Sequence, residues 1–257
     1  MPSVVALPHQ SRRLLPPYSP RIVFEDDDVL VVDKPPFLEA HPSKPGALTT
    51  LWDELRGLLA YEIANGGQVS IINRLDRETS GLTLVAKHRD AARRFSMLMQ
   101  ERAIEKEYVA LVHGHPPLDE WTVDGPLTRQ GSLRDSRVWV KQCVDPTGAP
   151  ARTDFRVERR FWKNAIPFAI VRARPETGRM HQIRVHLSHT GFGIVGDKLY
   201  GPAGEDCYLE FIETGWTPSL AARLLLPRQA LHSALLRAGG REWQSAWPAD
   251  LSEWASP

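Results

Sequence analysis

Residues 73–81 hold Asp76 between two arginines, Arg74 and Arg77, in a connection that joins two short apolar runs. The apolar runs are aliphatic and β-branched, which is typical of strands, and Thr79-Ser80-Gly81 is typical of a turn. The flanking guanidinium groups favour the ionised form of the Asp76 carboxyl group. An ionised carboxylate held at the end of a strand can act as a nucleophile or as a base.

The same stretch has two other interpretations. A charged connection between strands is usually solvated, and an exposed pair of carboxylate and arginine contributes little to stability. A second chemical interpretation combines Asp76 with Glu78, because paired carboxylates can cleave glycosidic bonds and residues i and i+2 of a strand lie on one face. The residues alone leave these alternatives open.

Four stretches of the chain follow one another in a characteristic order. They are Asp33-Lys34-Pro35-Pro36 with His41-Pro42, Arg74-Leu75-Asp76-Arg77-Glu78-Thr79-Ser80-Gly81-Leu82 with Ala86-Lys87, Lys106-Glu107-Tyr108-Val109-Ala110, and Gly178-Arg179-Met180-His181-Gln182-Ile183-Arg184-Val185-His186-Leu187 with Gly196-Asp197 and Tyr200-Gly201. Together they resemble the motifs of RNA pseudouridine synthases of the RluA type, which modify ribosomal and transfer RNA. The resemblance runs from about residue 21 to about residue 248.

This resemblance implies an isomerase that converts uridine to pseudouridine within structured RNA. The bond between C1′ and N1 breaks, the uracil turns, and C5 joins C1′, with no cofactor and no metal. The target nucleotide has to be flipped into a pocket, because its sugar is otherwise inaccessible in stacked RNA. The implied architecture is the α+β pseudouridine synthase catalytic fold, with a central mixed, mostly antiparallel sheet, flanking helices and a basic active-site cleft.

The resemblance also implies roles for individual residues. Asp76 would be the essential nucleophile or base, and we expect Arg179 to pair with it across the cleft. Tyr108 would stack on the uracil and could move the C5 proton, although a strand tyrosine can equally place its ring in the core. Arg74 would contact the flipped backbone or fill the vacated stack, and Ile183 would pack against the base. The other predicted substrate-binding residues are Arg77, Thr79, His181 and Arg184.

Two positions depart from the family pattern. Asn73 stands where the family often has His, and Met180 stands where it often has Thr. Neither position needs to carry the chemistry, so these departures bear on RNA contacts and substrate choice. A further alternative is an RNA-binding protein with an inactive site, but the intact set of Asp76, Tyr108 and the arginines argues against it.

The composition, 42% hydrophobic and 25% charged over 257 residues, is that of a globular protein with a sizeable core. Cys143 and Cys207 lie far apart, which predicts two reduced thiols. The spacing of His181, His186 and His189 is not a zinc pattern. No apolar run is long enough for a membrane span, and prolines interrupt the N-terminal segment. We expect a cytoplasmic monomer that binds rRNA or tRNA, touches no membrane and requires no protein partner.

The net charge of +1 is low for an RNA-binding protein, so the distribution of charge matters more than the sum. Basic residues gather in the middle of the chain, at 87–94, 129–141, 152–163 and 172–184. If these clusters face one side, they form a surface that binds phosphates. The alternative is that the interspersed Asp and Glu side chains simply pair with them.

We expect residues 1–20 to form a flexible Pro-rich arm and residues 21–257 to form a single catalytic domain. Many family members carry a small S4-type RNA-binding domain before the catalytic domain. About twenty residues cannot bury a core of that kind. The catalytic domain would therefore find its RNA largely by itself.

Hydrophobic periodicity and turn signals predict the elements. Strands are expected at 22–24, 29–32, 69–72, 82–86, 108–112, 138–140, 153–157 and 169–173, and a loop at 114–131. Helices are expected at 50–66, with Thr50 as N-cap, at 90–102 and from 181 to about 191, with a further helical stretch after 219. The connections are short, which predicts a largely antiparallel or mixed sheet.

Overall fold

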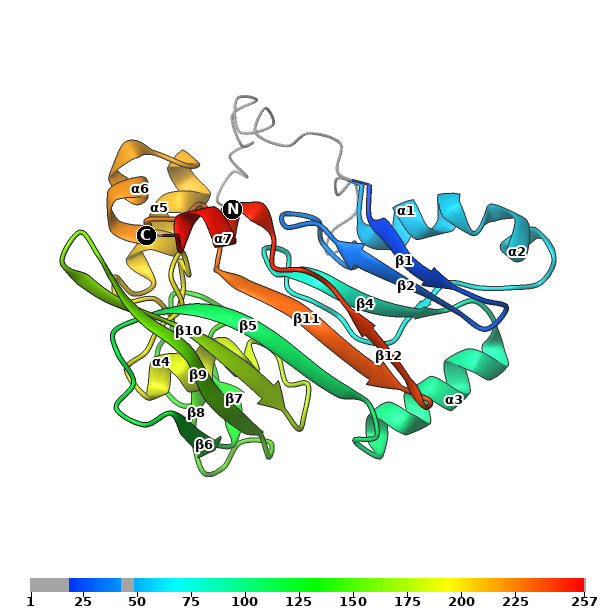
Figure 1. Cartoon of the computed structure of the whole chain (residues 1–257), viewed down its shortest axis with the longest axis horizontal. Coiled ribbons are helices and arrows are strands. Elements are labelled where there is room, and N and C mark those ends of the chain that lie inside the picture. The colour runs from blue at the N-terminus through cyan, green and yellow to red at the C-terminus, as the bar shows by residue number, and fades with distance from the viewer. Residues whose placement is uncertain (1–18, 43–48, 257) are drawn as a thin grey trace.

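The structure, a computed structural model, describes residues 19–42 and 49–256 of the chain. The predicted arm at residues 1–20 lies outside the described residues except for Ser19 and Pro20. A ten-stranded sheet runs through the whole molecule and carries helices on both sides (Figure 1). A two-stranded sheet lies beside it.

The bounds of the elements are as follows. The strands of the large sheet are β1 (Arg21–Glu25), β2 (Val29–Lys34), β3 (Ser70–Ile71), β4 (Ser80–Ala86), β5 (Glu105–His113), β6 (Glu120–Asp124), β9 (Arg152–Lys163), β10 (Ile166–Pro175), β11 (Leu231–Ala238) and β12 (Arg241–Gln244). The small sheet pairs β7 (Leu127–Arg129) with β8 (Gln142–Val144). The helices are α1 (Leu51–Leu58), α2 (Ala60–Ala64), α3 (Arg89–Gln100), the 3₁₀ helix η2 (Gln130–Ser132), α4 (Gln182–His189), α5 (Asp206–Thr214), α6 (Pro218–Leu224) and α7 (Ala249–Trp254).

The large sheet has the strand order β1-β2-β4-β11-β5-β10-β9-β6, with β3 added to β4 and β12 added to β11. Every pair of neighbouring strands is antiparallel except β4 and β11, which are parallel. The predicted mixed, mostly antiparallel sheet of an α+β fold is therefore confirmed. The parallel pair joins the half of the sheet built from β1 to β4 to the half built from β5 to β10.

The N-terminal half of the sheet is covered on both faces, and the sequence of β2 shows why. Val29 and Val31 contribute to a core with Phe95 of α3, whereas Leu30 and Val32 contribute to a core with Leu55 of α1. Successive side chains of a strand point to opposite faces, so a continuous apolar run supplies both layers. The predicted N-cap of α1 is also confirmed, because Thr50 and Asp53 form a capping box there.

The C-terminal half has its largest core between β5, β10 and α4. Leu111 of β5, Phe168 of β10 and Leu187 of α4 belong to one buried cluster, which Leu251 of α7 joins. Helix α4 is thus packed against the sheet through its apolar side chains. This packing leaves the polar residues at the start of α4 next to the end of β10, where the functional residues gather.

The parallel pairing of β4 with β11 depends on Gly81, which has a φ of 111°. Gly81 pairs with Ser233 of β11, and a Cβ atom on Gly81 would lie 2.3 Å from the Ser233 carbonyl oxygen. Only glycine allows this approach without displacing a backbone. The close approach fixes the start of β4, and with it the preceding loop that carries Asp76, against β11.

Three predicted elements differ from the structure. The predicted loop at 114–131 contains β6 and β7, and the predicted strand at 138–140 is a turn, with β8 following at Gln142–Val144. The predicted helix at 50–66 is divided into α1 and α2. Strands β6 and β7 are short and punctuated by proline and glycine, which hides them from a periodicity argument. Among the described residues, none of the helices has the length and apolarity needed to span a bilayer.

Candidate active site

The loop between β3 and β4 carries Asp76 and is held in place from both ends. The side chain of Asn73 is buried; its Nδ2 donates to the Leu82 carbonyl (3.0 Å), and its Oδ1 accepts from the Leu84 N–H (2.7 Å). Asn73 therefore has a structural role here, because its side chain holds the loop against β4. Met180, the other departure from the family pattern, is half-exposed.

A buried lysine, Lys34, donates a hydrogen bond to the same loop. Lys34 is fully buried, and its ammonium donates to the carbonyl oxygens of Arg77 (3.2 Å), Pro35 (2.9 Å) and Leu38 (2.9 Å). Burial lowers the pKa of Lys34 to about 7. These bonds tie the segment after β2 to the loop that carries Asp76.

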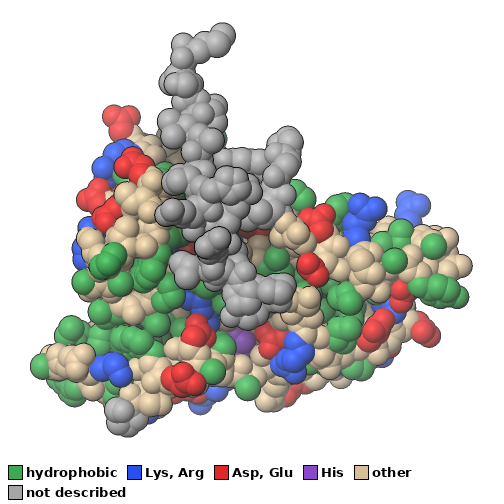
Figure 2. Space-filling view, turned by 90° about the horizontal axis from the view of Figure 1, so that it is seen from above, with side chains coloured by type: hydrophobic (Ala, Val, Ile, Leu, Met, Phe, Trp, Pro, Cys, Tyr) green, Lys and Arg blue, Asp and Glu red, His purple; other side chains and the backbone are tan. Residues whose placement is uncertain are grey.

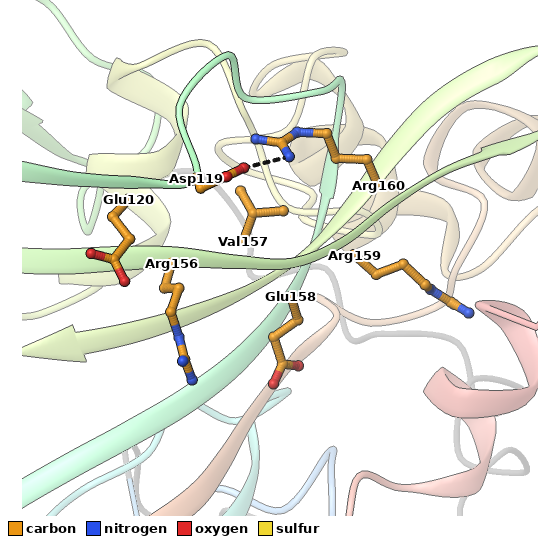
Figure 3. A pocket seen from close by; sticks show the side chains of 7 residues that line it. All are labelled: Asp119, Glu120, Arg156, Val157, Glu158, Arg159 and Arg160. Atoms are coloured by element: carbon orange, nitrogen blue, oxygen red, sulfur yellow. Dashed lines mark hydrogen bonds and ion pairs between the residues drawn. The ribbon is translucent and has the colours of Figure 1, made fainter.

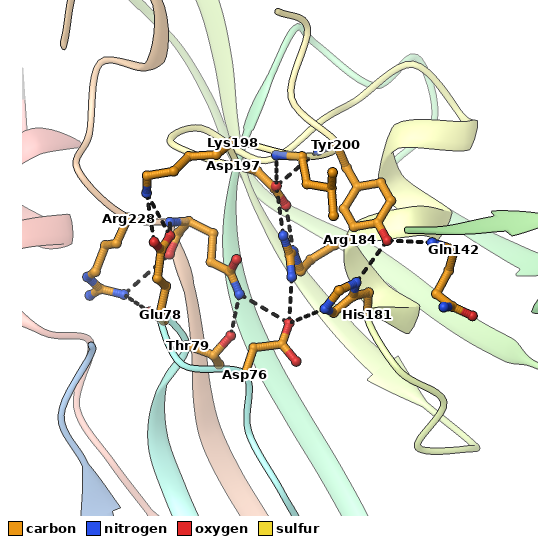
Figure 4. Close-up of polar contacts among 12 residues, drawn as sticks. Asp76, Glu78, Thr79, Gln142, His181, Arg184, Asp197, Lys198, Tyr200 and Arg228 are labelled. Carbon is orange, nitrogen blue, oxygen red and sulfur yellow. Dashed lines mark hydrogen bonds and ion pairs between the residues drawn. The ribbon is translucent and has the colours of Figure 1, made fainter. Parts of the chain in front are cut away.

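The carboxylate of Asp76 makes all its polar contacts through one oxygen, Oδ2. This atom accepts from Arg184 Nη1 at 2.7 Å and from Gln229 Nε2 at 3.4 Å, and it lies 3.9 Å from His181 Nε2 (Figure 4). Among the described residues, no hydrogen bond to Oδ1 is found. The Asp76 side chain is 30% exposed. The network thus orients the carboxylate and leaves one oxygen available to a substrate.

Arg184 is itself oriented by a second, fully buried carboxylate. Its Nε and Nη2 atoms donate to the two oxygens of Asp197 at 2.7 and 2.9 Å. The Asp197 Oδ1 atom also accepts from the backbone N–H groups of Leu199 and Tyr200. This fork leaves only Nη1 of Arg184 for Asp76. A bidentate pair of this kind fixes the plane of the guanidinium group.

The electrostatics of this network keep Asp76 ionised. Burial by itself would raise the pKa of Asp76, but the neighbouring His181 and Arg184, with hydrogen bonds from Arg184 and Gln229, hold it below its usual range. Burial, and then the charge of Arg184, lower the pKa of His181 to about 4. His181 is therefore neutral near pH 7, so Arg184 supplies the positive charge.

The predicted pairing of Arg179 with Asp76 is wrong. Arg179 is exposed, and its Nε donates to the Pro150 carbonyl at 3.3 Å. Arg184, predicted only to bind substrate, is the residue that contacts Asp76. Arg179 precedes α4 and lies at the rim, whereas Arg184 lies within α4 on its buried side, five residues further along the chain.

His181 takes part in a chain of hydrogen bonds that favours one of its two neutral tautomers. The Gln142 N–H donates to the Tyr200 hydroxyl oxygen at 2.8 Å, and the same hydroxyl lies 2.8 Å from His181 Nδ1. Since the oxygen already accepts one proton, its own proton is free to go to Nδ1, and the neutral ring then carries its hydrogen on Nε2. That N–H faces Asp76.

Most of the predicted site residues line a single pocket with a cavity of about 80 Å³. The structure brings together Asp76, Tyr108, Arg179, Arg74, Thr79, Ile183, Arg184 and His181 around this cavity. Tyr108 is 8% exposed, and burial raises its pKa to about 12. Its hydroxyl group is therefore protonated at neutral pH, and its ring forms part of the wall beside the carboxylate.

Two residues of the charged loop are not part of this wall. Arg77 does not line the pocket; its Nε lies 3.4 Å from the Phe37 carbonyl oxygen. Glu78 also turns away, because both its oxygens accept from Lys198 at 2.8 and 2.9 Å. Thr79 lines the pocket, but it is buried and its hydroxyl accepts from Gln229 Nε2 at 2.7 Å. Thr79 therefore orients Gln229.

Sequence reasoning missed several residues that complete the site. Asp197 and Tyr200 belong to the third motif, which also contains Arg184, so the motif itself indicates them as partners of Arg184 and its neighbours. Gln229 lies just before β11 and carries no local signal, since only the pairing of β11 with β4 brings it near Asp76. Lys106 lines the pocket two residues before Tyr108, on the same side of β5.

The basic clusters of the sequence are partly neutralised by neighbouring acidic residues. Arg137 and Lys141 pair with Glu205, and Arg172 and Arg174 pair with Glu107. On the face seen in Figure 2, outside the part covered by grey residues, Lys and Arg side chains stand among Asp and Glu side chains. No group of three or more His, Cys, Asp or Glu residues that could hold a metal ion occurs within 19–42 and 49–256.

Comparisons with known proteins agree with the fold and the motifs. Residues 28–189 match the sequence pattern of the family described as RNA pseudouridylate synthase. The chain is 36% identical over 241 residues to ribosomal large subunit pseudouridine synthase D of Yersinia pestis, covering 90% of this chain and 68% of that protein. It is 37% identical over 228 residues to an uncharacterized RNA pseudouridine synthase of Chloroflexus aurantiacus, covering 85% and 63%. The chain spans about two thirds of the length of these relatives.

Solved structures show the same fold. The human RNA pseudouridylate synthase domain containing 1 superposes with a TM-score of 0.66 at 26% identity, covering 91% of this chain and 86% of that chain. The human RNA pseudouridylate synthase domain containing 4 superposes with a TM-score of 0.70 at 23% identity, covering 91% and 90%. As its motifs predict, the chain belongs to the RNA pseudouridylate synthase family.

Proposed function

We propose that this protein isomerises uridine to pseudouridine at a specific site of large-subunit ribosomal RNA, with Asp76 as the nucleophile or base. One observation carries the proposal. The Asp76 carboxylate is held through Oδ2 by the buried pair of Arg184 and Asp197, while its Oδ1 atom accepts no hydrogen bond from a described residue and lies at a pocket bordered by Tyr108. Such preorganisation is what an active carboxylate needs.

The reaction is an isomerisation, so the protein has to supply an ionised oxygen and no group is transferred from a second substrate. The C1′–N1 bond breaks, a C1′–C5 bond forms, the C5 proton leaves, and N1 of the old linkage ends up protonated. Attack on C1′, addition to C6 or removal of the C2′ proton would each begin at a negatively charged oxygen of Asp76. Arg184 holds that oxygen in its charged state, and it also limits the rotation of the carboxylate.

The pocket suits a nucleotide that has left its helix. The cavity is small, and Asp76 lies within its wall, so a uridine that stays stacked in RNA could not present its sugar to the carboxylate. We assign Tyr108 and Ile183 to the two sides of the extruded base, because both side chains are buried at the cavity wall. Arg74 and Arg179 are exposed at the rim, where they can meet RNA phosphates.

The choice of ribosomal RNA rests on the relatives. Those reported above include a ribosomal large subunit pseudouridine synthase, which favours ribosomal over transfer RNA as the substrate. We further propose that the protein acts in the cytoplasm as a monomer, because the carboxylate, its partners and the pocket wall all come from one chain. The paired-carboxylate alternative has no support, since Glu78 is bound by Lys198 and does not line the pocket.

The test compares ribosomal RNA from cells with and without the gene. Carbodiimide treatment followed by reverse transcription marks pseudouridines, and we expect at least one mark in large-subunit RNA to vanish in the deletion strain and to return with the wild-type gene. Purified protein added to the unmodified RNA should restore the same mark without releasing free uracil. Unchanged marks in both large-subunit and transfer RNA, or release of uracil, would refute the proposal.

A further inference from the structure

The described part of the chain contains four buried lysines, and three of them are well bonded. Lys34 donates to three carbonyl oxygens within 3.2 Å. Lys87 binds Glu25 and Glu62 at 2.8 and 2.9 Å. Lys198 binds Glu78 at 2.8 Å and the Pro227 carbonyl at 2.7 Å. This is the usual state of a buried cation, whose charge is costly to keep without partners.

Lys106 is the exception among these four. It is 6% exposed, and its ammonium has only the Thr177 carbonyl oxygen at 3.5 Å and the Met99 sulfur at 3.9 Å. No carboxylate of the described residues lies within 4.0 Å of it. An ammonium group has three protons to donate, and both contacts are at the limit of a hydrogen bond. Folding has buried a cation here without giving it a counterion.

The strand geometry explains this arrangement. Lys106 and Tyr108 are two residues apart on β5, so both side chains point to the same face of the sheet. The intervening Glu107 points to the opposite face, where Arg172 and Arg174 bind it. The acidic residue nearest in sequence is therefore unavailable to Lys106, and the lysine shares its face with the pocket.

Lys106 also borders the pocket beside a residue that has no side chain. Lys106 lines the same pocket as Asp76 and Tyr108, and a Cβ atom at Gly178 would lie 3.6 Å from its Nζ. Because residue 178 is glycine, no side chain stands in that place. Arg179, the next residue, lies at the same rim and forms no ion pair with any described carboxylate.

We propose that Lys106 binds a backbone phosphate of the extruded nucleotide and so acts as a positioning residue that anchors the uridine in front of Asp76. This inference rests on the proposed function for the identity of the ligand. A phosphate oxygen would supply the counterion that the fold withholds, and the shared face of β5 would then hold the phosphate beside the base that Tyr108 borders. Burial lowers the pKa of Lys106, and a bound phosphate would favour the charged form again.

The experiment uses uridine 3′,5′-bisphosphate and plain uridine as probes, with binding followed by NMR titration or calorimetry. Lys106→Met should weaken binding of the bisphosphate about 10- to 100-fold, as expected for a hydrogen bond to a charged group, and should change uridine binding less than twofold. Lys106→Arg, which keeps the charge, should recover part of the loss. The control Lys163→Met, which removes a lysine outside the pocket, should leave both affinities unchanged.

Thermal unfolding separates this role from a structural one. Lys106→Met should melt at the wild-type temperature or above it, because the substitution removes an uncompensated buried charge. Equal loss of uridine and bisphosphate binding, a clear drop in melting temperature, or wild-type protein that binds the two probes alike would each overturn the proposal. None of these readouts requires turnover, so they stand apart from the rRNA mapping that tests the proposed function.

Discussion

Two hollows of this molecule differ in size and in how their charged groups are held. The larger, with a volume of about 580 Å³, is lined by Asp119, Glu120, Arg156, Val157, Glu158, Arg159 and Arg160 on the outer strands (Figure 3). In it, Arg160 pairs with Asp119, and Glu158 pairs with Arg172. The smaller hollow, at about 80 Å³, contains Asp76.

The contrast lies in the surroundings of the charges. In the large hollow the Asp119 side chain is 82% exposed, so water screens its pair with Arg160. The Arg172 and Glu158 side chains of the second pair are 30% and 31% exposed. In the small hollow the Arg184 side chain is 9% exposed and that of Asp197 is fully buried. Chemistry is therefore assigned to the smaller hollow, because buried and oriented charges stabilise a reacting group far more than solvated ones.

The largest effect after loss of Asp76 itself is expected from Arg184→Gln. The substitution removes the charge that orients Asp76, and we expect the single-turnover rate of pseudouridine formation to fall about 10²- to 10⁴-fold. It also leaves Asp197 buried without its partner, so urea unfolding should show a loss of about 3–5 kcal/mol.

A second substitution separates these two effects of Arg184→Gln. Adding Asp197→Asn removes the stranded carboxylate and should restore much of the stability without restoring the rate. A double variant that regains the rate would show that Arg184 acts only through the fold. The ion pairs of the small hollow would then be only structural, as we expect those of the large hollow to be.

The pH profile should show the same contrast within the active site. The pKa of Asp76 is lowered, that of His181 is about 4 and that of Tyr108 about 12. Because the proposed reaction needs an ionised Asp76, we expect the rate to fall only as pH falls through its lowered pKa. These three groups should therefore leave single-turnover rates level between about pH 5.5 and 9 in the wild type. A change of rate near pH 7 would report Lys34, whose pKa is about 7 and which holds the loop that carries Asp76.

Without the charge of Arg184, burial of Asp76 is opposed less, so its pKa rises and the acid limb should move upward into the measured range. The same sign applies to folding. The stability contributed by the Asp76 and Asp197 pKa shifts is present above the usual aspartate pKa and is lost as pH falls through the lowered values. An unmoved acid limb in Arg184→Gln would argue against the assigned charge partner.

Arg179→Gln should have a smaller effect, although the sequence pattern favoured this arginine. Its guanidinium is exposed at the rim and does not touch Asp76. We expect RNA affinity to fall a few-fold, about as much as the loss of one phosphate contact, with a less steep salt dependence and an unchanged rate at saturating RNA. A rate loss as large as that of Arg184→Gln would instead support the pairing of Arg179 with Asp76 that the sequence predicts.

The smallest effect is expected in the large hollow. Arg156→Gln changes an exposed side chain that lines this hollow and has no ion pair to a described carboxylate. Stability should stay within about 0.5 kcal/mol of the wild type, and the rate should change less than twofold. A strong loss of RNA affinity in this variant would make the outer strands part of the RNA-binding surface.

The sequence predicts the parts of this molecule that depend on local chemistry. The apolar run of β2 and the capping box at Thr50 each carry their own signal, and the structure confirms both. The turn predicted at 79–81 is wrong, because the turn lies at residues 77–78 and Gly81 belongs to β4. The loop predicted at 114–131 fails because β6 is half-exposed and short, and it is a strand mainly through its pairing with β9. That pairing partner lies some thirty residues away, beyond any local pattern.

The site shows the same division. The motifs predict Asp76 and Tyr108 as site residues, and both line the pocket. The choice between Arg179 and Arg184 depends on how α4 packs against the sheet, because the two arginines are five residues apart and face different surroundings. Gln229 reaches Asp76 only through the parallel pairing of β4 with β11. Tertiary packing decides such contacts.

The central claim, that the free oxygen of Asp76 starts the reaction, is tested most directly by single-turnover assays of Asp76→Asn on unmodified large-subunit RNA. The control is Asp27→Asn, which removes an exposed carboxylate that is distant from Asp76 in the sequence. We expect Asp76→Asn to bind the RNA with an affinity close to that of the wild type and to form no detectable pseudouridine, while Asp27→Asn behaves as the wild type. Pseudouridine formation by Asp76→Asn at the wild-type rate would contradict the account.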